Sequence, residues 1–281
     1  MREIEALKRP LFWLALLLIL VWTALFSLPD NKLHLVFCDV GQGDAILISY
    51  QKTQILIDGG PDNRVLSCLS RHLPFWDRRL EVVILTHPEE DHFGGLIDVI
   101  KRYNVNHFVV NSLEKKSTSF EAFYRLVLGR KSSVYSPKAG EKIKIGTLEL
   151  LILWPREKLY VTELNDNSIV LKLAFGHFSA LLPGDLSTKF ENQLDLTPVE
   201  VLKVAHHGSQ YSTSQTFLEK IKPKLAVVSV GKNKFGHPTK ETLKRLEDLG
   251  IKVLRTDQNG EIEIVSDGKS WYIKSLKGLA L

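Results

Sequence analysis

The residue types best suited to chemistry in this chain are histidines and aspartates that follow short apolar segments. The densest group lies in Thr86–Gly95, directly after the apolar run Val82–Leu85. A tight turn at the end of a strand brings such side chains together around a metal ion. An exposed polar loop that caps the following helix is the alternative, and further segments of the same kind make it the weaker one. The candidate ligands in this loop are His87, Glu89, Asp91 and His92.

Two aspartates elsewhere also follow apolar strands. Asp185 comes after Phe178–Leu182, and Asp58 closes Gln54–Ile57 in front of two glycines. A single Asp beside Gly is usually a turn or a helix cap, so each is a weak signal alone. In a shared site, Asp185 would bridge two metal ions and Asp58 would orient a ligand histidine from behind.

Three histidines near the C-terminal half complete the candidate set. His206 and His207 follow the apolar run Val201–Ala205, and His237 precedes a proline. Because adjacent side chains point in different directions, we expect His206 to be the ligand. His207 would then lie behind the ligands or contact substrate. A purely structural role remains open for His237.

This set of residues predicts a hydrolytic metal centre. Histidine and carboxylate side chains at strand ends hold a cation on a rigid scaffold and leave one side open to substrate. A bound divalent cation lowers the pKa of its water towards neutrality, and two cations clamp the attacking and leaving oxygens. We expect one or two divalent ions, Mn²⁺ or Zn²⁺.

The rest of the sequence predicts the elements that position these residues. Short apolar runs separated by glycine or polar turns predict strands, whereas longer patterned segments predict helices. Their order suggests two sheets packed face to face with helices outside, and not a doubly wound parallel sheet. The clearest elements are strands at Leu33–Cys38 and Ala45–Ser49, a hairpin of Ser168–Phe175 and His177–Leu182, and helices at Asp62–His72, Gly94–Tyr103 and Thr239–Leu249.

The N-terminus carries an apolar run, Leu11–Leu28, that is near the lower length limit for crossing a bilayer. We expect residues 1–31 to be a membrane anchor with its linker and residues 32–281 to form the globular domain. A cleaved signal peptide, which would leave the domain secreted, is the second interpretation, and a buried helix the third. Cations precede the run, at Arg2, Lys8 and Arg9, so the domain is expected outside the cytoplasmic membrane.

Composition sets broad limits. The 281 residues are 44% hydrophobic and 25% charged, which is ordinary for a globular protein with a sizeable core. A net charge of +5 mildly favours nucleic acid or a phospholipid surface as partner, although a solvated surface explains it equally well. The two cysteines, Cys38 and Cys68, have no metal-ligand spacing, and we favour buried free thiols over a disulfide.

Several of these motifs resemble, in order, those of the metallo-β-lactamase superfamily: Asp58-Gly59-Gly60, Thr86-His87-x-x-x-Asp91-His92, Gly184-Asp185 and His206. Longer segments are similar to the hydrolase domain of ComEC-type DNA-internalisation competence proteins, over residues 33–266. The resemblance implies a four-layer αββα sandwich, here preceded by one transmembrane helix, and a nuclease-like activity on DNA. The longer segments that carry the similarity to ComEC-type proteins are Phe37–Ala45, Asn167–Leu171, Lys203–Ser209 and Phe235–Pro238.

The resemblance also gives functional weight to residues that spacing alone does not. It implies catalytic roles for Asp91, His207, His237 and Lys203. It implies supporting or structural roles for Asp39, Asp44 and Asp58. Candidate contacts to substrate are Lys203, Ser209, Lys232 and Lys234.

The chain departs from the family pattern in three ways. Glu89 stands where the superfamily has His and ComEC-type domains have Asp, which favours Mn²⁺ over Zn²⁺. A third His is missing before Asp185, in the region of Trp154-Pro155, so one metal position is expected to be oxygen-rich, weak or empty. The multi-helix channel of ComEC-type proteins has no counterpart in this sequence, which leaves a separately encoded DNA-uptake channel as a candidate partner.

Three functions follow from this sequence. The first is a phosphodiesterase or nuclease that acts on DNA outside the cytoplasmic membrane. The second is a metallohydrolase of a small-molecule phosphodiester or ester, because the fold serves many substrates. The third is a non-catalytic, membrane-tethered subunit with a degraded metal site.

Overall fold

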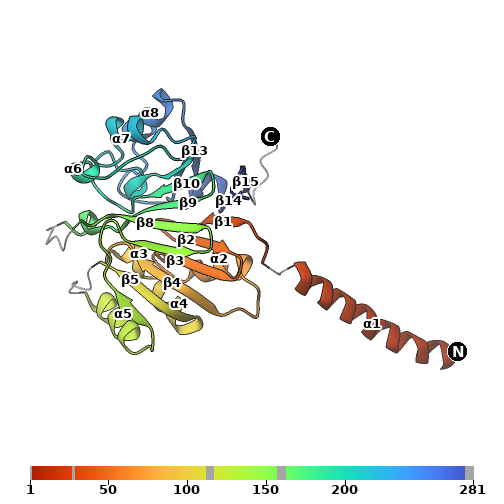
Figure 1. Cartoon of the computed structure of the whole chain (residues 1–281). Helices are drawn as coiled ribbons and strands as arrows, with labels where there is room; N and C mark the ends of the chain where they lie inside the picture. Colours follow the sequence, from red (N-terminus) through yellow and green to blue (C-terminus); the bar gives the residue numbers. More distant parts are fainter. Residues whose placement is uncertain (1, 27–28, 112–116, 157–162, 276–281) are drawn as a thin grey trace.

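Two β-sheets packed face to face form the body of the protein, and helices cover both outer faces (Figure 1). The structure, a computed structural model, describes residues 2–26, 29–111, 117–156 and 163–275. The layers therefore follow the order helix, sheet, sheet, helix. This confirms the expected four-layer αββα sandwich.

The first sheet has eight strands in the order β15-β14-β1-β2-β3-β4-β5-β6. Neighbouring strands are antiparallel from β15 to β3 and parallel from β3 to β6. The strands are β1 Leu33–Phe37, β2 Ile46–Tyr50, β3 Thr53–Ile57, β4 Arg79–Leu85, β5 Asn104–Val110, β6 Ser133–Tyr135, β14 Ile262–Ser266 and β15 Trp271–Ser275.

The second sheet has seven strands in the order β13-β12-β11-β10-β9-β8-β7. Its parallel half runs from β13 to β10 and its antiparallel half from β10 to β7. The predicted hairpin is confirmed, with Phe175 opposite Phe178 at its turn. The strands are β7 Lys142–Ile145, β8 Leu148–Trp154, β9 Val170–Phe175, β10 Phe178–Leu182, β11 Val201–Lys203, β12 Leu225–Val228 and β13 Lys252–Arg255.

Alternation of side chains along the strands builds three apolar layers. In β1, Leu33, Leu35 and Phe37 pack between the sheets, while Val36 faces the helices. The outer helices close the other faces: α2, α4 and α5 pack on the first sheet, and α7 and α8 on the second. The helices are α2 Arg64–His72, α3 Glu90–Phe93, α4 Leu96–Arg102, α5 Thr118–Leu128, α6 Thr188–Glu191, α7 Gln215–Ile221, α8 Lys240–Asp248 and α9 Thr256–Asn259, with 3-10 turns η1 Leu164–Asn167 and η2 Ala205–Gly208.

A close backbone approach explains the glycines that follow the His87–His92 loop. A Cβ atom on Gly95 would lie 2.1 Å from the carbonyl oxygen of Gly59 and 2.3 Å from that of Asp62. The loop after β3 and the start of α4 therefore touch through backbone atoms. Only glycine at position 95 allows this contact, which brings Asp58 next to the loop after β4.

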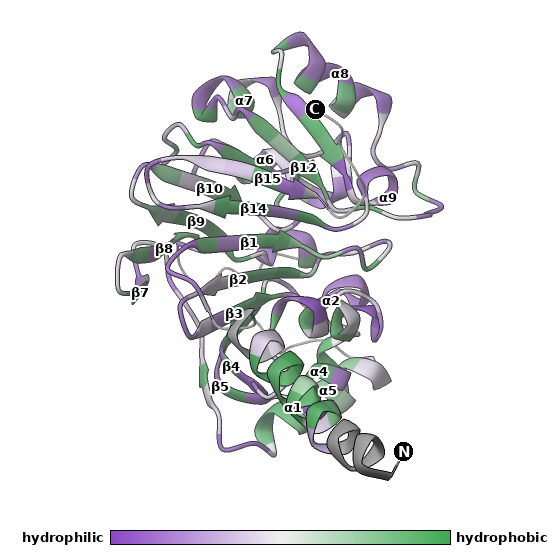
Figure 2. Ribbon diagram, turned by 90° about the vertical axis from the view of Figure 1, so that its right-hand side faces the viewer, coloured by the Kyte–Doolittle hydropathy of each residue, from purple (hydrophilic) through white to green (hydrophobic). Residues whose placement is uncertain are grey.

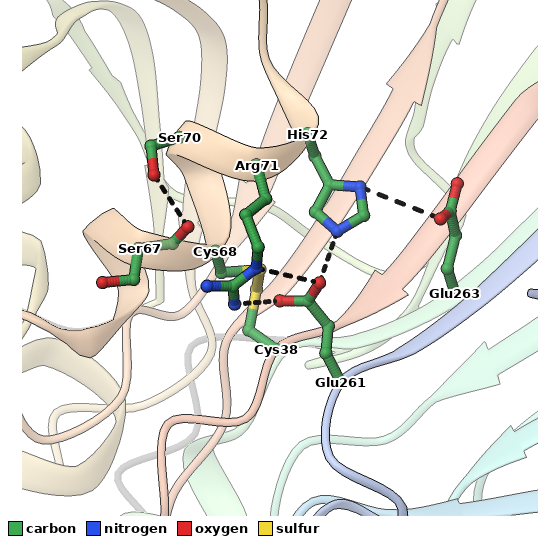
Figure 3. The surroundings of a disulfide bond; sticks show 8 residues. All are labelled: Cys38, Ser67, Cys68, Ser70, Arg71, His72, Glu261 and Glu263. Carbon is green, nitrogen blue, oxygen red and sulfur yellow. Dashed lines mark hydrogen bonds and ion pairs between the residues drawn. A yellow bond between two sulfur atoms is a disulfide. The ribbon is translucent and has the colours of Figure 1, made fainter. Parts of the chain in front are cut away.

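A disulfide joins Cys38 and Cys68, and the expectation of free thiols was wrong (Figure 3). Cys38 follows β1 and Cys68 lies on α2, in the apolar layer between the first sheet and its helices. The two residues are 30 positions apart, so their pairing depends on how α2 packs and not on local spacing. The bond ties α2 to the start of the loop that carries Asp44.

The N-terminal helix α1, Arg2–Phe26, extends away from the body of the protein (Figure 1). Its described apolar side chains are exposed. In Figure 2 the ribbon of this helix lies in the foreground, and the green part marks its apolar residues. Among the described residues, no helix combines the length and apolar character needed to cross a membrane. The expected anchor also includes residues 27–28, which lie outside the described part of the chain. The boundary at residues 31 and 32 stays a prediction.

Removing the disulfide should destabilise the domain. We expect Cys38→Ala/Cys68→Ala to lower the free energy of unfolding by about 3 kcal/mol, because the bond closes a loop of intermediate length in the unfolded chain. Urea unfolding measures the change. Dithiothreitol should destabilise the wild type to the same extent and leave the double variant unaffected, and equal sensitivity of both proteins would contradict the bond.

Candidate metal centre

The candidate site lies at one edge of the sandwich, where strands from both sheets end. Asp58 follows β3 and His87 follows β4, and these strands are parallel. Asp185 and His207 come after β10 and β11, the corresponding parallel pair of the second sheet. Because parallel strands end on the same side, each sheet delivers two of these side chains to a shared edge. The loop after β1 adds Asp44.

Three imidazoles aim their Nε2 atoms at one carboxylate. The Nε2 atoms of His87, His92 and His207 lie 4.0, 3.4 and 3.3 Å from Oδ2 of Asp185. The Nε2 of His207 is also 3.3 Å from Oδ2 of Asp91. All three Nε2 atoms are buried and have no hydrogen-bond partner. Since buried polar atoms are rarely left unpaired, this arrangement fits a cation held between them.

The opposite ring nitrogens fix the orientation of each imidazole. His207 Nδ1 donates to the Ser229 carbonyl at 2.9 Å, and His92 Nδ1 donates to the Asp58 carboxylate at 2.8 Å. Because Thr86 Oγ1 donates to Asp58 at 2.7 Å, it accepts at 3.0 Å from His87 Nδ1. Each ring therefore carries a proton on Nδ1 and turns its Nε2 atom towards the centre, as metal-binding histidines do.

The structure reverses the expected order of the two adjacent histidines. His207 is buried and belongs to the groups of converging ligand atoms among the described residues. The His206 side chain is 29% exposed, belongs to none of these groups, and has its Nε2 3.4 Å from the Asn165 amide nitrogen. Both histidines adopt left-handed backbone conformations, with φ of 51° and 53°. This conformation costs roughly 1–2 kcal/mol per residue. The strained turn η2 is what points His207 inwards and His206 to the rim.

Lys203 supports the site from inside. Its side chain is fully buried, and Nζ donates to the Gly184 carbonyl at 2.9 Å and to Asp185 at 3.1 Å, and pairs with Asp44. Burial opposes the charge, but Asp44 and Asp185 together raise the pKa of Lys203 above its ordinary value. This burial contradicts the expected contact with substrate. Lys203 instead fixes Asp185 and the loop that carries Asp44.

The site has a strong excess of negative charge. Four carboxylates, from Asp44, Asp58, Asp91 and Asp185, face one fixed cation, Lys203. Although burial lowers imidazole pKa values, Asp185 outweighs it, raising the pKa of His92 well above its ordinary value and that of His207 to about 10. Burial and neighbouring His92 lower the pKa of His87. The charge is balanced by protons on His92 and His207 or by a divalent cation, whose binding releases those protons.

The remaining candidates lie outside the convergent group. The carboxylate of Glu89 is not among the converging ligand atoms of the described residues, so its role as a ligand stays a prediction. His237 lies at the rim, its ring 5.4 Å from that of His206, and burial lowers its pKa to about 4. Asp39 is exposed and accepts from Gly41 N, which is the structural alternative foreseen for it.

The expected contacts to substrate divide into two kinds. Lys232 and Lys234 are exposed on the loop beside His237. Ser209 is buried and its hydroxyl accepts from the backbone of Tyr211 at 3.3 Å, so it holds the turn and does not reach substrate. The expectation for Ser209 was wrong because the turn after His207 folds back under α8.

Sequence reasoning assigned no role to three residues that hold the site together. Thr86 links His87 to Asp58, Ser229 orients His207, and the Ser168 hydroxyl accepts from Asp185 N at 3.0 Å. Thr86 and Ser168 stand inside recognised motifs, but a hydroxyl at one position forms no pattern. Ser229 acts through its carbonyl, which any residue supplies, so no signal marked it.

Comparison with known proteins agrees with this geometry. The model of the metallo-beta-lactamase superfamily matches residues 38–232. The chain belongs to this superfamily. Two of its solved relatives by fold are YhfI from Bacillus subtilis, with a TM-score of 0.56 at 13% identity, and CmlA from Streptomyces venezuelae, a diiron β-hydroxylase, with a TM-score of 0.54 at 16%. The match covers 82% of this chain and 99% of YhfI, and 85% of this chain and 54% of CmlA.

Among the curated relatives of this chain are competence proteins. ComE operon protein 3 of Bacillus subtilis is 31% identical over 80% of this chain and 32% of its own length. Competence protein ComA of Neisseria gonorrhoeae is 29% identical over 84% of this chain and 33% of its own. The resemblance to the hydrolase domain of ComEC-type proteins is confirmed. The chain spans about a third of the length of these relatives.

The two adjacent histidines provide a matched test of the metal site. We expect His207→Ala to weaken binding of Mn²⁺ by more than the roughly 10–100-fold caused by losing a residue behind the ligands. His206→Ala should retain nearly wild-type affinity, because His206 lies at the rim. Isothermal titration of metal-free protein with MnCl₂ measures both, and the reverse order of effects would restore the sequence-based assignment.

Lys203 provides a test of the charge balance. Lys203→Met leaves Asp44 and Asp185 buried without their cation, so we expect the metal-free protein to lose roughly 3–5 kcal/mol of stability. Adding Asp44→Asn to this variant should recover part of the loss. Urea unfolding in EDTA measures the cycle, with the exposed Lys232→Met as control. An unchanged unfolding midpoint for Lys203→Met would contradict the role given to this side chain.

Proposed function

We propose that this protein is a metal-dependent phosphodiesterase that cleaves DNA outside the cytoplasmic membrane. The observation that carries the proposal is the convergence of three unpartnered, buried Nε2 atoms on the carboxylate of Asp185, with the carboxylate of Asp91 beside His207. A ligand set of imidazoles and carboxylates at strand ends is typical of hydrolytic metal sites.

We assign Asp91, His92, His207 and Asp185 to one divalent ion, and His87 with Asp185 to a second. Two groups of converging ligand atoms among the described residues support two ions: Asp91, His92 and His207 form one group, and His87, His92 and Asp185 form the other, with His92 common to both. A bound ion of this kind acidifies water and neutralises the charge that develops on a phosphate. The preference for carboxylate ligands favours Mn²⁺ over Zn²⁺.

The protein's own residues hold this centre and shape its opening. Lys203 keeps one oxygen of Asp185 turned inwards, leaving Oδ2 for the centre. Asp58 and Thr86 fix His92 and His87 from behind. His206 and His237 line the opening, where a substrate phosphate would arrive.

The rim supplies a surface suited to nucleic acid. Phe235 is 61% exposed, its ring lies 5.8 Å from that of His237 at an interplanar angle of 28°, and Lys234 Nζ lies 5.8 Å from the Phe235 ring centroid. The rings of Phe235, His237 and His206 thus form a row from solvent to the centre. An exposed aromatic ring beside a cation fits a nucleobase and its phosphate.

A single side chain holds this loop in shape. Asn233 Oδ1 accepts from the backbone N–H groups of Phe235 and His237, and its Nδ2 donates to the carbonyls of Gly231 and His237. All four hydrogen-bonding positions of the amide are used. The loop therefore presents Phe235 at a defined place and not as a mobile contact, which favours specific binding.

Two features support a location outside the cytoplasmic membrane. The apolar run 11–28 with its preceding cations has the pattern of an anchor whose following domain is exported. The disulfide between Cys38 and Cys68 is typical of proteins that fold in an oxidising compartment. A separately encoded DNA-uptake channel would be the natural partner of such a domain.

The purified full chain should cleave DNA oligonucleotides when Mn²⁺ is added. We expect Phe235→Ala to raise KM for single-stranded DNA about tenfold, since stacking on an aromatic side chain contributes roughly 1–3 kcal/mol per base. Phe235→Trp should retain the wild-type KM, and cleavage of bis(4-nitrophenyl) phosphate should be unaffected by either variant.

Other outcomes distinguish the alternatives. Efficient cleavage of the chromogenic phosphodiester without cleavage of DNA would favour a small-molecule substrate. Less than one bound metal ion per chain after loading would favour the non-catalytic subunit.

A further inference from the structure

The chain enters its domain at the edge opposite the metal centre. β1 starts at Leu33, which pairs with Tyr50 at the end of β2, and β3 and β4 also start at this edge. The centre lies where β3 and β4 end. At about 3.3 Å per residue, strands of this length separate the two edges by roughly 20 Å.

Two large aromatic side chains project from this edge. Phe75 is 74% exposed and Trp76 is 46% exposed, in the loop between α2 and β4. Their rings contact each other edge to face, with centroids 4.7 Å apart. Adjacent exposed aromatics on a globular domain mark a contact surface. Tryptophan in particular favours the headgroup region of a bilayer, where one side of the ring is apolar and the other wet.

Cations without acidic partners lie at the same edge as the aromatic pair, just before the starts of β1, β3 and β4. Among the described residues, Lys32, Lys52 and Arg78 form no ion pair with a carboxylate, in contrast to Arg71, which binds Glu261 (Figure 3). Arg78 lies over the ring of Tyr103, with 5.5 Å between guanidinium and centroid. A surface that combines unpaired cations with exposed aromatics complements an anionic lipid surface.

A cavity places this loop beside the linker. Pro29 and Asp30 of the linker line a cavity of about 420 Å³ together with Leu73 and Pro74. Phe75 directly follows Pro74, so the aromatic pair lies next to a cavity that the linker also lines. The carboxylates in this cavity, Asp30 and Glu263, are both bound to His34, and Glu263 also pairs with Lys274.

We propose that the loop Leu73–Arg79, with Lys32 and Lys52, docks on an anionic phospholipid surface. Phe75 and Trp76 lie among the headgroups, and the three unpaired cations contact lipid phosphates. Docking at this edge holds the metal centre roughly 20 Å above the bilayer with its opening turned away from it. The inference rests on the proposed membrane location and adds a defined orientation to it.

Hydrogen exchange of the full chain tests the docking loop. The protein is reconstituted in vesicles of phosphatidylcholine, in vesicles of equal parts phosphatidylcholine and phosphatidylglycerol, and in detergent. We expect the amides of residues 73–79 to exchange at least about fivefold more slowly in the anionic vesicles, because each cation near such a surface strengthens binding by about that factor.

Variants separate docking from a general effect. Phe75→Ser/Trp76→Ser should lose the protection, and replacing Lys32, Lys52 and Arg78 by Gln should remove its dependence on phosphatidylglycerol. Tyr135→Ser is the matched control, because Tyr135 is 48% exposed but lies at the end of β6, on the edge of the metal centre. Equal exchange of residues 73–79 in all three environments overturns the docking surface.

Independent readouts keep this result apart from the proposed function. Resistance to extraction by alkaline carbonate reports on the anchor, and DNA cleavage in detergent reports on the metal centre. A chain that resists extraction and cleaves DNA, but shows an unprotected loop, refutes only the docking surface. Extraction of the chain by carbonate refutes the anchor, whatever the exchange of the loop.

Discussion

The structure depends on one electrostatic constraint, the crowding of carboxylates around Asp185 in a largely buried site. Lys203 is the only fixed cation among the described residues of the site, and it cannot balance four carboxylates. The unpaired Nε2 atoms of His87, His92 and His207 face the same point. Buried charges of one sign destabilise a fold unless they are paired or bind a metal. The site therefore needs additional positive charge, which bound protons or a divalent ion supply.

The rest of the fold brings those side chains together and keeps them there. Parallel strands of both sheets end at one edge, and backbone contact at Gly95 lets the loops after β3 and β4 approach closely. The disulfide fixes α2 to the start of the loop that carries Asp44. Chain entry and the exposed aromatic loop are at the other edge. The sandwich thus separates the edge that performs chemistry from the edge that meets the membrane in our proposals.

Much of this was predictable from sequence. The run from His87 to His92 concentrates ligand types after an apolar strand, and short apolar runs such as Leu33–Phe37 predict strands buried on both faces. Those patterns lie within single short segments, so they can be recognised without knowledge of tertiary packing. The order of motifs then identified the sandwich, and Asp185 gained meaning only from the other ligands.

Other features were not predictable because they depend on tertiary packing or on an unusual backbone. Two consecutive left-handed residues turned His207 and not His206 inwards, and sequence patterns do not anticipate such strain. Lysine is rarely buried, and Lys203 was expected to contact substrate. The Cys38–Cys68 bond joins residues that only the packing of α2 brings within reach.

The central claim is that this crowded site holds a metal ion between named atoms. Anomalous diffraction from crystals of the Mn²⁺-loaded protein tests it most directly. We predict a manganese peak within coordination distance of Nε2 of both His92 and His207, in contact with the carboxylates of Asp91 and Asp185. A map with no manganese between these atoms, and with the imidazoles turned away from one another, would contradict it.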